Sequence, residues 1–105
     1  MQRKLSFTPT ADAQLTALEN SPAQAALLAQ VLKALGYLEI DPHPPGLQTH
    51  KFTSLTGANG EKVFEACAQN NTPGAYRIFW HYGPEEIKGK KRTPAITVVA
   101  ITRHP

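Results

Sequence analysis

The stretch Ala75-Tyr-Arg-Ile-Phe-Trp-His-Tyr82 decides the fold, because its aromatic and β-branched residues are typical of a central β-strand. Turn-forming residues bound it, Pro73-Gly74 before it and Gly83-Pro84 after it. Side chains alternate along a strand, which divides the middle of this one between two faces. One face carries Ile78, Trp80 and Tyr82, and the other carries Arg77, Phe79 and His81. Arg77 therefore needs an explanation, since an unpaired cation is costly to bury in such a strand.

Length and composition indicate one domain covering residues 1–105. The single cysteine, Cys67, excludes an internal disulfide and a multi-cysteine zinc site, and no metal or cofactor is expected. No run approaches the ~18 apolar residues of a membrane span, and the N-terminus lacks the apolar segment of a signal peptide. We therefore expect a cytoplasmic protein. Its net charge of +3 is compatible with a polyanionic partner.

Two helices are predicted before the sheet. Thr8-Pro9 starts the first with a threonine cap and a proline at the first helical position, and the helix should end near Asn20. Ser21-Pro22-Ala23-Gln24 starts the second, with Gln24 as a capping-box partner. Its apolar stripe has helical spacing and consists of Leu28, Val31, Leu32 and Leu35. The second helix should fray between Gly36 and Glu39, and the short linker predicts a helical hairpin.

Alternation and turn signals predict five strands. They are Arg3–Phe7, His50–Leu55, Lys62–Gln69, Ala75–Tyr82 and Ala95–Thr102. The stretch from Gly83 to Pro94 is expected to be a polar loop. The order β-α-α-β-β-β-β predicts an α+β fold, a twisted antiparallel sheet with a two-helix hairpin on one face.

Strand parity predicts which side chains share a face of the sheet. The helix-facing set is Phe52, Phe64, Ala66, Ile78, Trp80, Ile96 and Val98. The opposite face, expected to be open to solvent, then collects Lys51, Glu65, Arg77, His81 and Arg103.

Three segments, in this order of elements, resemble the RelE/ParE superfamily of bacterial toxin–antitoxin toxins. They are His50-Lys-Phe-Thr-Ser-Leu-Thr-Gly57, Tyr76-Arg-Ile-Phe-Trp80 and Ile96-Thr-Val-Val-Ala-Ile-Thr-Arg-His104. The resemblance covers nearly the whole chain. It implies a ribosome-dependent endoribonuclease that cleaves messenger RNA, or in the ParE branch an inhibitor of DNA gyrase. It also implies neutralisation by a cognate antitoxin and a role in plasmid stabilisation.

The nuclease branch implies attack of a ribose 2′-hydroxyl on the adjacent phosphate, with no metal required. By resemblance, Arg77 stabilises the phosphate charge, His104 is the general acid, and Glu65 is the base. The expected RNA-binding residues are Lys51, Arg103, His81, Lys90 and Lys91.

Structural alternatives stay open for these residues. Arg77 could pair with Glu65 across neighbouring strands, and His81 could be an ordinary sheet-face residue. The basic run at 88–92 is either a solvated loop or a polyanion contact. Glu65 also stands on a strand where RelE carries lysines, and the basic loop is longer than that family's turn. A second functional class therefore remains, a binding module of the same fold that inhibits gyrase or has lost catalysis.

Overall fold

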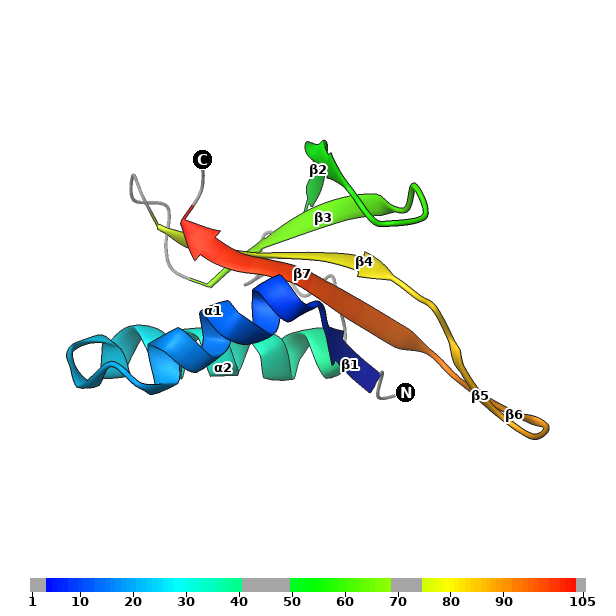
Figure 1. Cartoon of the computed structure of the whole chain (residues 1–105), viewed down its shortest axis with the longest axis horizontal. Helices are drawn as coiled ribbons and strands as arrows, with labels where there is room; N and C mark the ends of the chain where they lie inside the picture. Colours follow the sequence, from blue (N-terminus) through cyan, green and yellow to red (C-terminus); the bar gives the residue numbers. More distant parts are fainter. Residues whose placement is uncertain (1–3, 41–49, 69–74, 104–105) are drawn as a thin grey trace.

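The computed structural model describes residues 4–40, 50–68 and 75–103 (Figure 1). Two helices follow the first strand, α1 (Pro9–Glu19) and α2 (Ala25–Ile40), and a 3₁₀ turn at Pro22–Gln24 separates them. The strands are β1 (Lys4–Phe7), β2 (His50–Thr56), β3 (Lys62–Cys67), β4 (Tyr76–Tyr82), β5 (Glu86–Lys88), β6 (Lys91–Thr93) and β7 (Ala95–Arg103).

Five strands form the main sheet in the order β1-β7-β4-β3-β2, with β4 at its centre. The pairs β7·β4, β4·β3 and β3·β2 are antiparallel, while β1 runs parallel to β7. Both helices lie along one face of the strongly twisted sheet (Figure 1). The predicted α+β architecture is confirmed, and the parallel edge pair is an addition to it.

The main core lies between the helices and that face of the sheet. Its fully buried members include Val31 and Leu38 of α2, Ile78 and Trp80 of β4, and Ile96 of β7. Phe64 packs against this cluster and stacks on Trp80, with ring centroids 5.0 Å apart. The apolar face predicted for β4 is therefore the face that packs against the helices and forms the main core.

The start of α1 is as predicted, and the start of α2 is not. Thr8 Oγ1 accepts a hydrogen bond from the Ala11 N–H at 3.2 Å and donates to the Val99 carbonyl at 3.0 Å, which ties α1 to β7. Ser21 makes no side-chain cap. The expected fraying near Gly36 is also wrong, because Leu35 and Leu38 are buried in the core and hold α2 helical to Ile40.

The pairing of β2 with β3 and a bulge in β7 correct the predicted faces. Lys51 pairs with Phe64 and so lies on the helix side, while the Phe52 ring packs on Phe79, 4.9 Å between centroids, on the opposite side. In β7 an extra residue sits between Val98 and Ala100, which brings Arg103 opposite Tyr76 and onto the helix side. A one-residue bulge reverses the face of every residue beyond it.

Two further expectations were wrong. The segment expected as a polar loop contains an antiparallel hairpin, β5–β6, whose tight turn uses Gly89 at φ +59°. The face away from the helices is closed around its centre: Phe79 is 1% exposed, Glu65 2%, His81 5% and Arg77 8%. Packing of Phe52 on Phe79 gives this side a small second core.

Candidate functional site on the buried polar face

Arg77 lies near the start of β4, between Cys67 of β3 and Thr102 of β7. Its guanidinium Nη1 donates to the carbonyl of Tyr76 at 3.3 Å, a long hydrogen bond. Its Nε is buried and has no hydrogen-bond partner within the part of the chain that the structure describes. A charge-bearing group held in this way is under-solvated, and an anion with several acceptor oxygens would relieve the cost.

Glu65 occupies the same face one strand away. The register sets it opposite Phe79, so Arg77 is its diagonal neighbour and not its direct cross-strand partner. Backbones of such diagonal neighbours are roughly 7–8 Å apart, within reach of long side chains. The register thus places Glu65 and Arg77 on the same face of adjacent strands, and their pairing and catalytic roles remain predictions.

His81 lies farther along β4 on that face. Its Nδ1 is 2.9 Å from the carbonyl oxygen of Tyr82. Since a carbonyl oxygen can only accept, Nδ1 is the donor in this hydrogen bond. The His81 ring is therefore oriented by a hydrogen bond to the backbone.

Glu61, which sequence reasoning did not single out, lies close to His81. A Cβ placed on Gly57 would be 2.3 Å from Glu61 Oε1 and 3.0 Å from His81 Cδ2, so this glycine leaves room for both side chains. Glu61 Oε1 accepts from the Asn59 N–H at 2.9 Å. Hydrogen bonds from the backbone N–H groups of Glu61 and Asn59 lower the pKa of Glu61, with a smaller contribution from His81. The turn at residues 56–60 was predicted from the sequence. The position of Glu61 directly after that turn is the sequence feature that could have identified it as a site residue.

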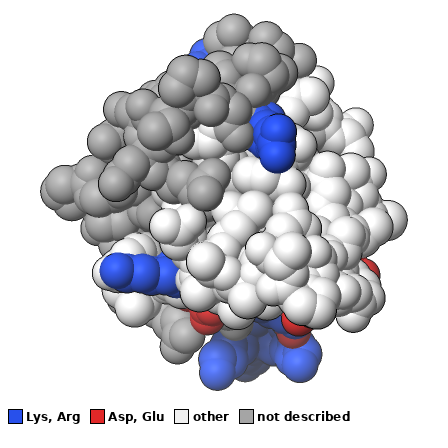
Figure 2. All heavy atoms as spheres, turned by 90° about the vertical axis from the view of Figure 1, so that its left-hand side faces the viewer, with Lys and Arg blue, Asp and Glu red and all other residues white. Residues whose placement is uncertain are grey.

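The remaining sequence-predicted residues lie elsewhere. Lys51 and Arg103 are exposed on the helix side of the sheet, and Lys90 and Lys91 are exposed on the β5–β6 hairpin. His104 lies outside the described residues. Figure 2 shows the end of the molecule opposite the hairpin, where single basic groups are scattered over a mostly uncharged surface.

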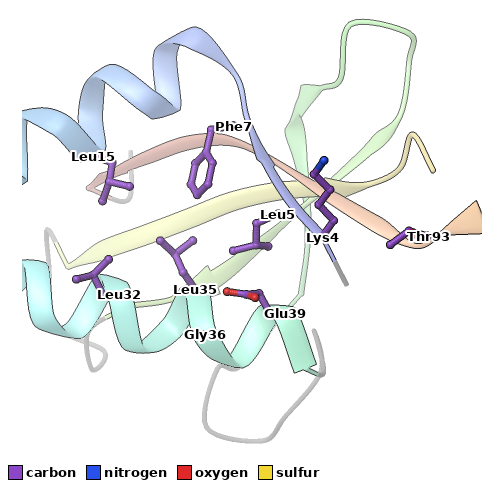
Figure 3. Close-up of a pocket in the computed structure, with 9 residues that line it drawn as sticks. All are labelled: Lys4, Leu5, Phe7, Leu15, Leu32, Leu35, Gly36, Glu39 and Thr93. Atoms are coloured by element: carbon purple, nitrogen blue, oxygen red, sulfur yellow. The ribbon is translucent and has the colours of Figure 1, made fainter. Parts of the chain in front are cut away.

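A separate groove of about 600 Å³ opens between β1 and the two helices. Figure 3 shows apolar side chains from three elements converging on it: Leu5 and Phe7 of β1, Leu15 of α1, and Leu32 and Leu35 of α2. Lys4 and Glu39 also line it. Leu32 is 48% exposed here, so the groove presents a large apolar side chain to solvent.

Within residues 4–40, 50–68 and 75–103, no group of three His, Cys, Asp or Glu side chains could hold a metal ion. None of the helices in this part of the chain is both long and apolar enough to cross a membrane.

Solved structures with a similar fold include a YoeB/ParE toxin from Agrobacterium tumefaciens, at a TM-score of 0.65 and 11% identity. That alignment covers 97% of this chain and 99% of the toxin. A YoeB dimer from Staphylococcus aureus superposes with a TM-score of 0.64 and 10% identity over the full length of both chains. The chain has the fold of the RelE/ParE-type toxins. At this identity the likeness concerns the fold alone, and neither a family model nor a curated protein matches the sequence.

Proposed function

We propose that the chain is a RelE-like toxin that cleaves messenger RNA on the ribosome and is neutralised by an antitoxin. The observation that carries the proposal is the state of Arg77, which is 8% exposed and whose buried Nε has no partner among the described residues. A guanidinium needed only for folding would be expected to have its donors satisfied. A phosphate supplies the missing acceptors and matches the planar fork of arginine.

In this proposal the ribose 2′-hydroxyl attacks the adjacent phosphate and the 5′-oxygen leaves, without a metal. Arg77 binds the scissile phosphate and gains strength as negative charge builds in the transition state. Glu65 is the proposed base, and His104 stays the proposed general acid. His81 and the exposed cations Lys51 and Arg103 are assigned to RNA contacts outside the reacting atoms.

The groove between β1 and the helices is the proposed docking site of the antitoxin. It is apolar at its base, borders the outer edge of β1 and carries the half-exposed Leu32. An amphipathic or extended segment fits such a place, by groove docking or by addition of a strand. Leu32→Glu should weaken binding of the co-expressed antitoxin, while Glu39, also in the groove, offers a milder probe as Glu39→Gln.

The decisive experiment measures single-turnover cleavage of messenger RNA by the purified chain on ribosomes, for wild type, Arg77→Met and Thr102→Ala. Thr102 lies directly opposite Arg77 in the sheet and tests for simple local disturbance. Arg77→Met should lower the cleavage rate about 10²–10³-fold, equivalent to ~3–4 kcal/mol of transition-state stabilisation. Folded Arg77→Met that cleaves like wild type would overturn the assignment of Arg77.

The alternative is a non-nuclease module of the same fold, acting on DNA gyrase or lacking activity. The burial of Glu65 and Arg77 favours it, because a substrate must displace or open the packing around Phe52 and Phe79 to reach them. Inhibition of gyrase supercoiling by a wild-type chain that cleaves no RNA would establish this alternative.

A further inference from the structure

The β5–β6 hairpin is a projecting basic arm, here defined as residues 86–93. Figure 1 shows it continuing past the ends of β4 and β7, away from the helices. Its backbone pairs are Glu86 with Thr93, Ile87 with Arg92 and Lys88 with Lys91. The exposed cations at and beside the turn are Lys88, Lys90, Lys91 and Arg92.

Folding does not use most of this charge. Lys88 and Lys91 are directly opposite each other, and like charges in that position destabilise a hairpin. The arm's acidic residue, Glu86, bonds to Lys4 of β1 and lies 3.3 Å from Lys88. Among the residues that the structure describes, Lys90, Lys91 and Arg92 make no ion pair. The arm therefore tolerates repulsion that a bound polyanion would relieve.

The base of the arm is fixed to the body of the molecule. Lys4 Nζ donates to Glu86 Oε2, the Gly83 N–H donates to the Ala95 carbonyl at 2.8 Å, and Thr97 Oγ1 donates to the Gly83 carbonyl at 2.7 Å. Pro84 and Pro94 have no N–H and so cannot extend the ladder between β4 and β7 into the arm. The charged turn is thus held at one end of a molecule whose longest extent is 45 Å.

We propose that the arm binds the phosphate backbone of a structured RNA at a position separate from the one that Arg77 serves. Gly89 is twelve positions beyond Arg77, so at ~3.3 Å per extended residue the two are at most about 40 Å apart, and Figure 1 shows the turn of the arm well beyond the end of β4. No single phosphate can touch both. The inference rests on the proposed function for its partner, RNA, and makes that partner a large one that reaches both ends of the chain.

Phosphate contact fits the arm better than an acidic protein surface does. Lysines bind phosphates as point charges and release counterions, which needs no complementary shape. The arm has no aromatic residue on which a base could stack, so it should not read sequence. Ile87, 61% exposed, is its one apolar side chain, too little for the apolar centre of a protein interface.

The test compares two double variants that remove the same charge from the full chain. Lys90→Gln/Lys91→Gln alters the arm, and Lys33→Gln/Lys62→Gln alters exposed lysines elsewhere. Anisotropy of a fluorescein-labelled RNA hairpin gives the affinity from about 50 to 200 mM salt. The arm variant should bind more weakly and lose roughly two units of the salt-dependence slope, about one for each lysine. The control should keep the wild-type slope to within half a unit.

Equal slopes for wild type and the arm variant overturn the inference, and so does an equal loss in both double variants. Arm-dependent binding of poly-glutamate without arm-dependent binding of RNA also overturns it, in favour of an acidic protein partner. Arg77→Met should leave the arm-dependent slope in place. A chain that cleaves nothing but keeps that slope therefore refutes the proposed nuclease activity and supports the arm as an RNA contact.

Discussion

Charged residues gather in two regions, and the two regions hold them in opposite ways. On the polar face of the sheet, Glu65, Arg77 and His81 are nearly excluded from solvent. On the arm, Lys90, Lys91 and Arg92 are exposed. A buried charge carries a large desolvation cost, and its free energy depends strongly on each neighbouring group. An exposed charge carries little desolvation cost, salt screens its interactions, and the effects of several such charges are mostly additive. The first region is therefore suited to chemistry at one phosphate, and the second to attraction of many.

The largest expected effect concerns the core beneath the polar face. Trp80→Ala removes a fully buried indole that stacks on Phe64, and should lower the free energy of unfolding by about 3–5 kcal/mol. Urea unfolding followed by circular dichroism measures it. The same experiment on Ile87→Ala, in the arm, should show less than about 0.5 kcal/mol, because exposed side chains contribute little. A large loss at Ile87 would mean that the arm is part of the cooperative core.

A matched pair of arginine substitutions tests the two regions directly. Arg77→Met replaces an incompletely bonded buried cation with an apolar chain of similar length. The desolvation cost that is removed offsets the contacts that are lost, including any with Glu65, so the free energy of unfolding should stay level to within about 1 kcal/mol. Arg92→Met, in the exposed arm, should change it by less than about 0.5 kcal/mol. Urea titrations of both variants decide the matter. A fall of more than 1 kcal/mol for Arg77→Met would identify Arg77 as a structural residue.

The two regions also differ in how far the sequence could predict them. On β4 and β3, apolar alternation is regular, and parity placed Phe64, Ile78 and Trp80 on the helix side correctly. On β7 the same rule failed for Arg103, because nothing in Ala95–Arg103 marks the extra residue before Ala100. Bulges depend on how neighbouring strands meet, which is not a property of the strand's own sequence.

The candidate site was predictable in its members and not in its environment. Arg77 and Glu65 share a face as alternation predicts. Their burial, and the packing of Phe52 on Phe79 on the same face, depend on how neighbouring strands align, which the sequence of one strand does not determine. The arm was missed for a local reason. Its strands have three residues each and are rich in lysine, so β-propensity is weak, and Gly89 at positive φ supplies the turn.

An intermediate effect is expected where Gly57 meets the polar face. Gly57→Ala places a methyl group against Glu61 and His81, so Glu61 must give up its bond to the Asn59 N–H. The free energy of unfolding should fall by about 1–3 kcal/mol. Each glycine substitution is also made together with Glu61→Ala, and Gly60→Ala serves as the control. Removing the carboxylate should recover part of the stability lost in Gly57→Ala and none of that lost in Gly60→Ala. Equal losses with and without Glu61 would show that the carboxylate is not the obstacle.

The smallest effects come from two carboxylates, one in each region, whose pKa values are both lowered. In Glu61 the chief cause is hydrogen bonding by backbone N–H groups, and in Glu86 it is the hydrogen bond from Lys4, followed by that from Lys88. A carboxyl group with a lowered pKa in the folded state stabilises the fold above its ordinary pKa near 4.5. This stabilisation is lost as the pH falls through the lower, folded-state pKa.

Salt should separate the two contributions. Urea midpoints measured between pH 7 and pH 3 should show a smaller acid loss for Glu61→Gln and for Glu86→Gln than for wild type. At 1 M salt the Debye length is about 3 Å, so the exposed pairing of Glu86 with lysines is weakened, and its variant should then follow wild type. Glu61 keeps its backbone hydrogen bonds, which salt screens less, so Glu61→Gln should still differ from wild type. If both variants follow wild type at high salt, the lowered pKa of Glu61 arises from charge pairing, like that of Glu86. The contrast between the two regions then does not extend to the turn at 56–60.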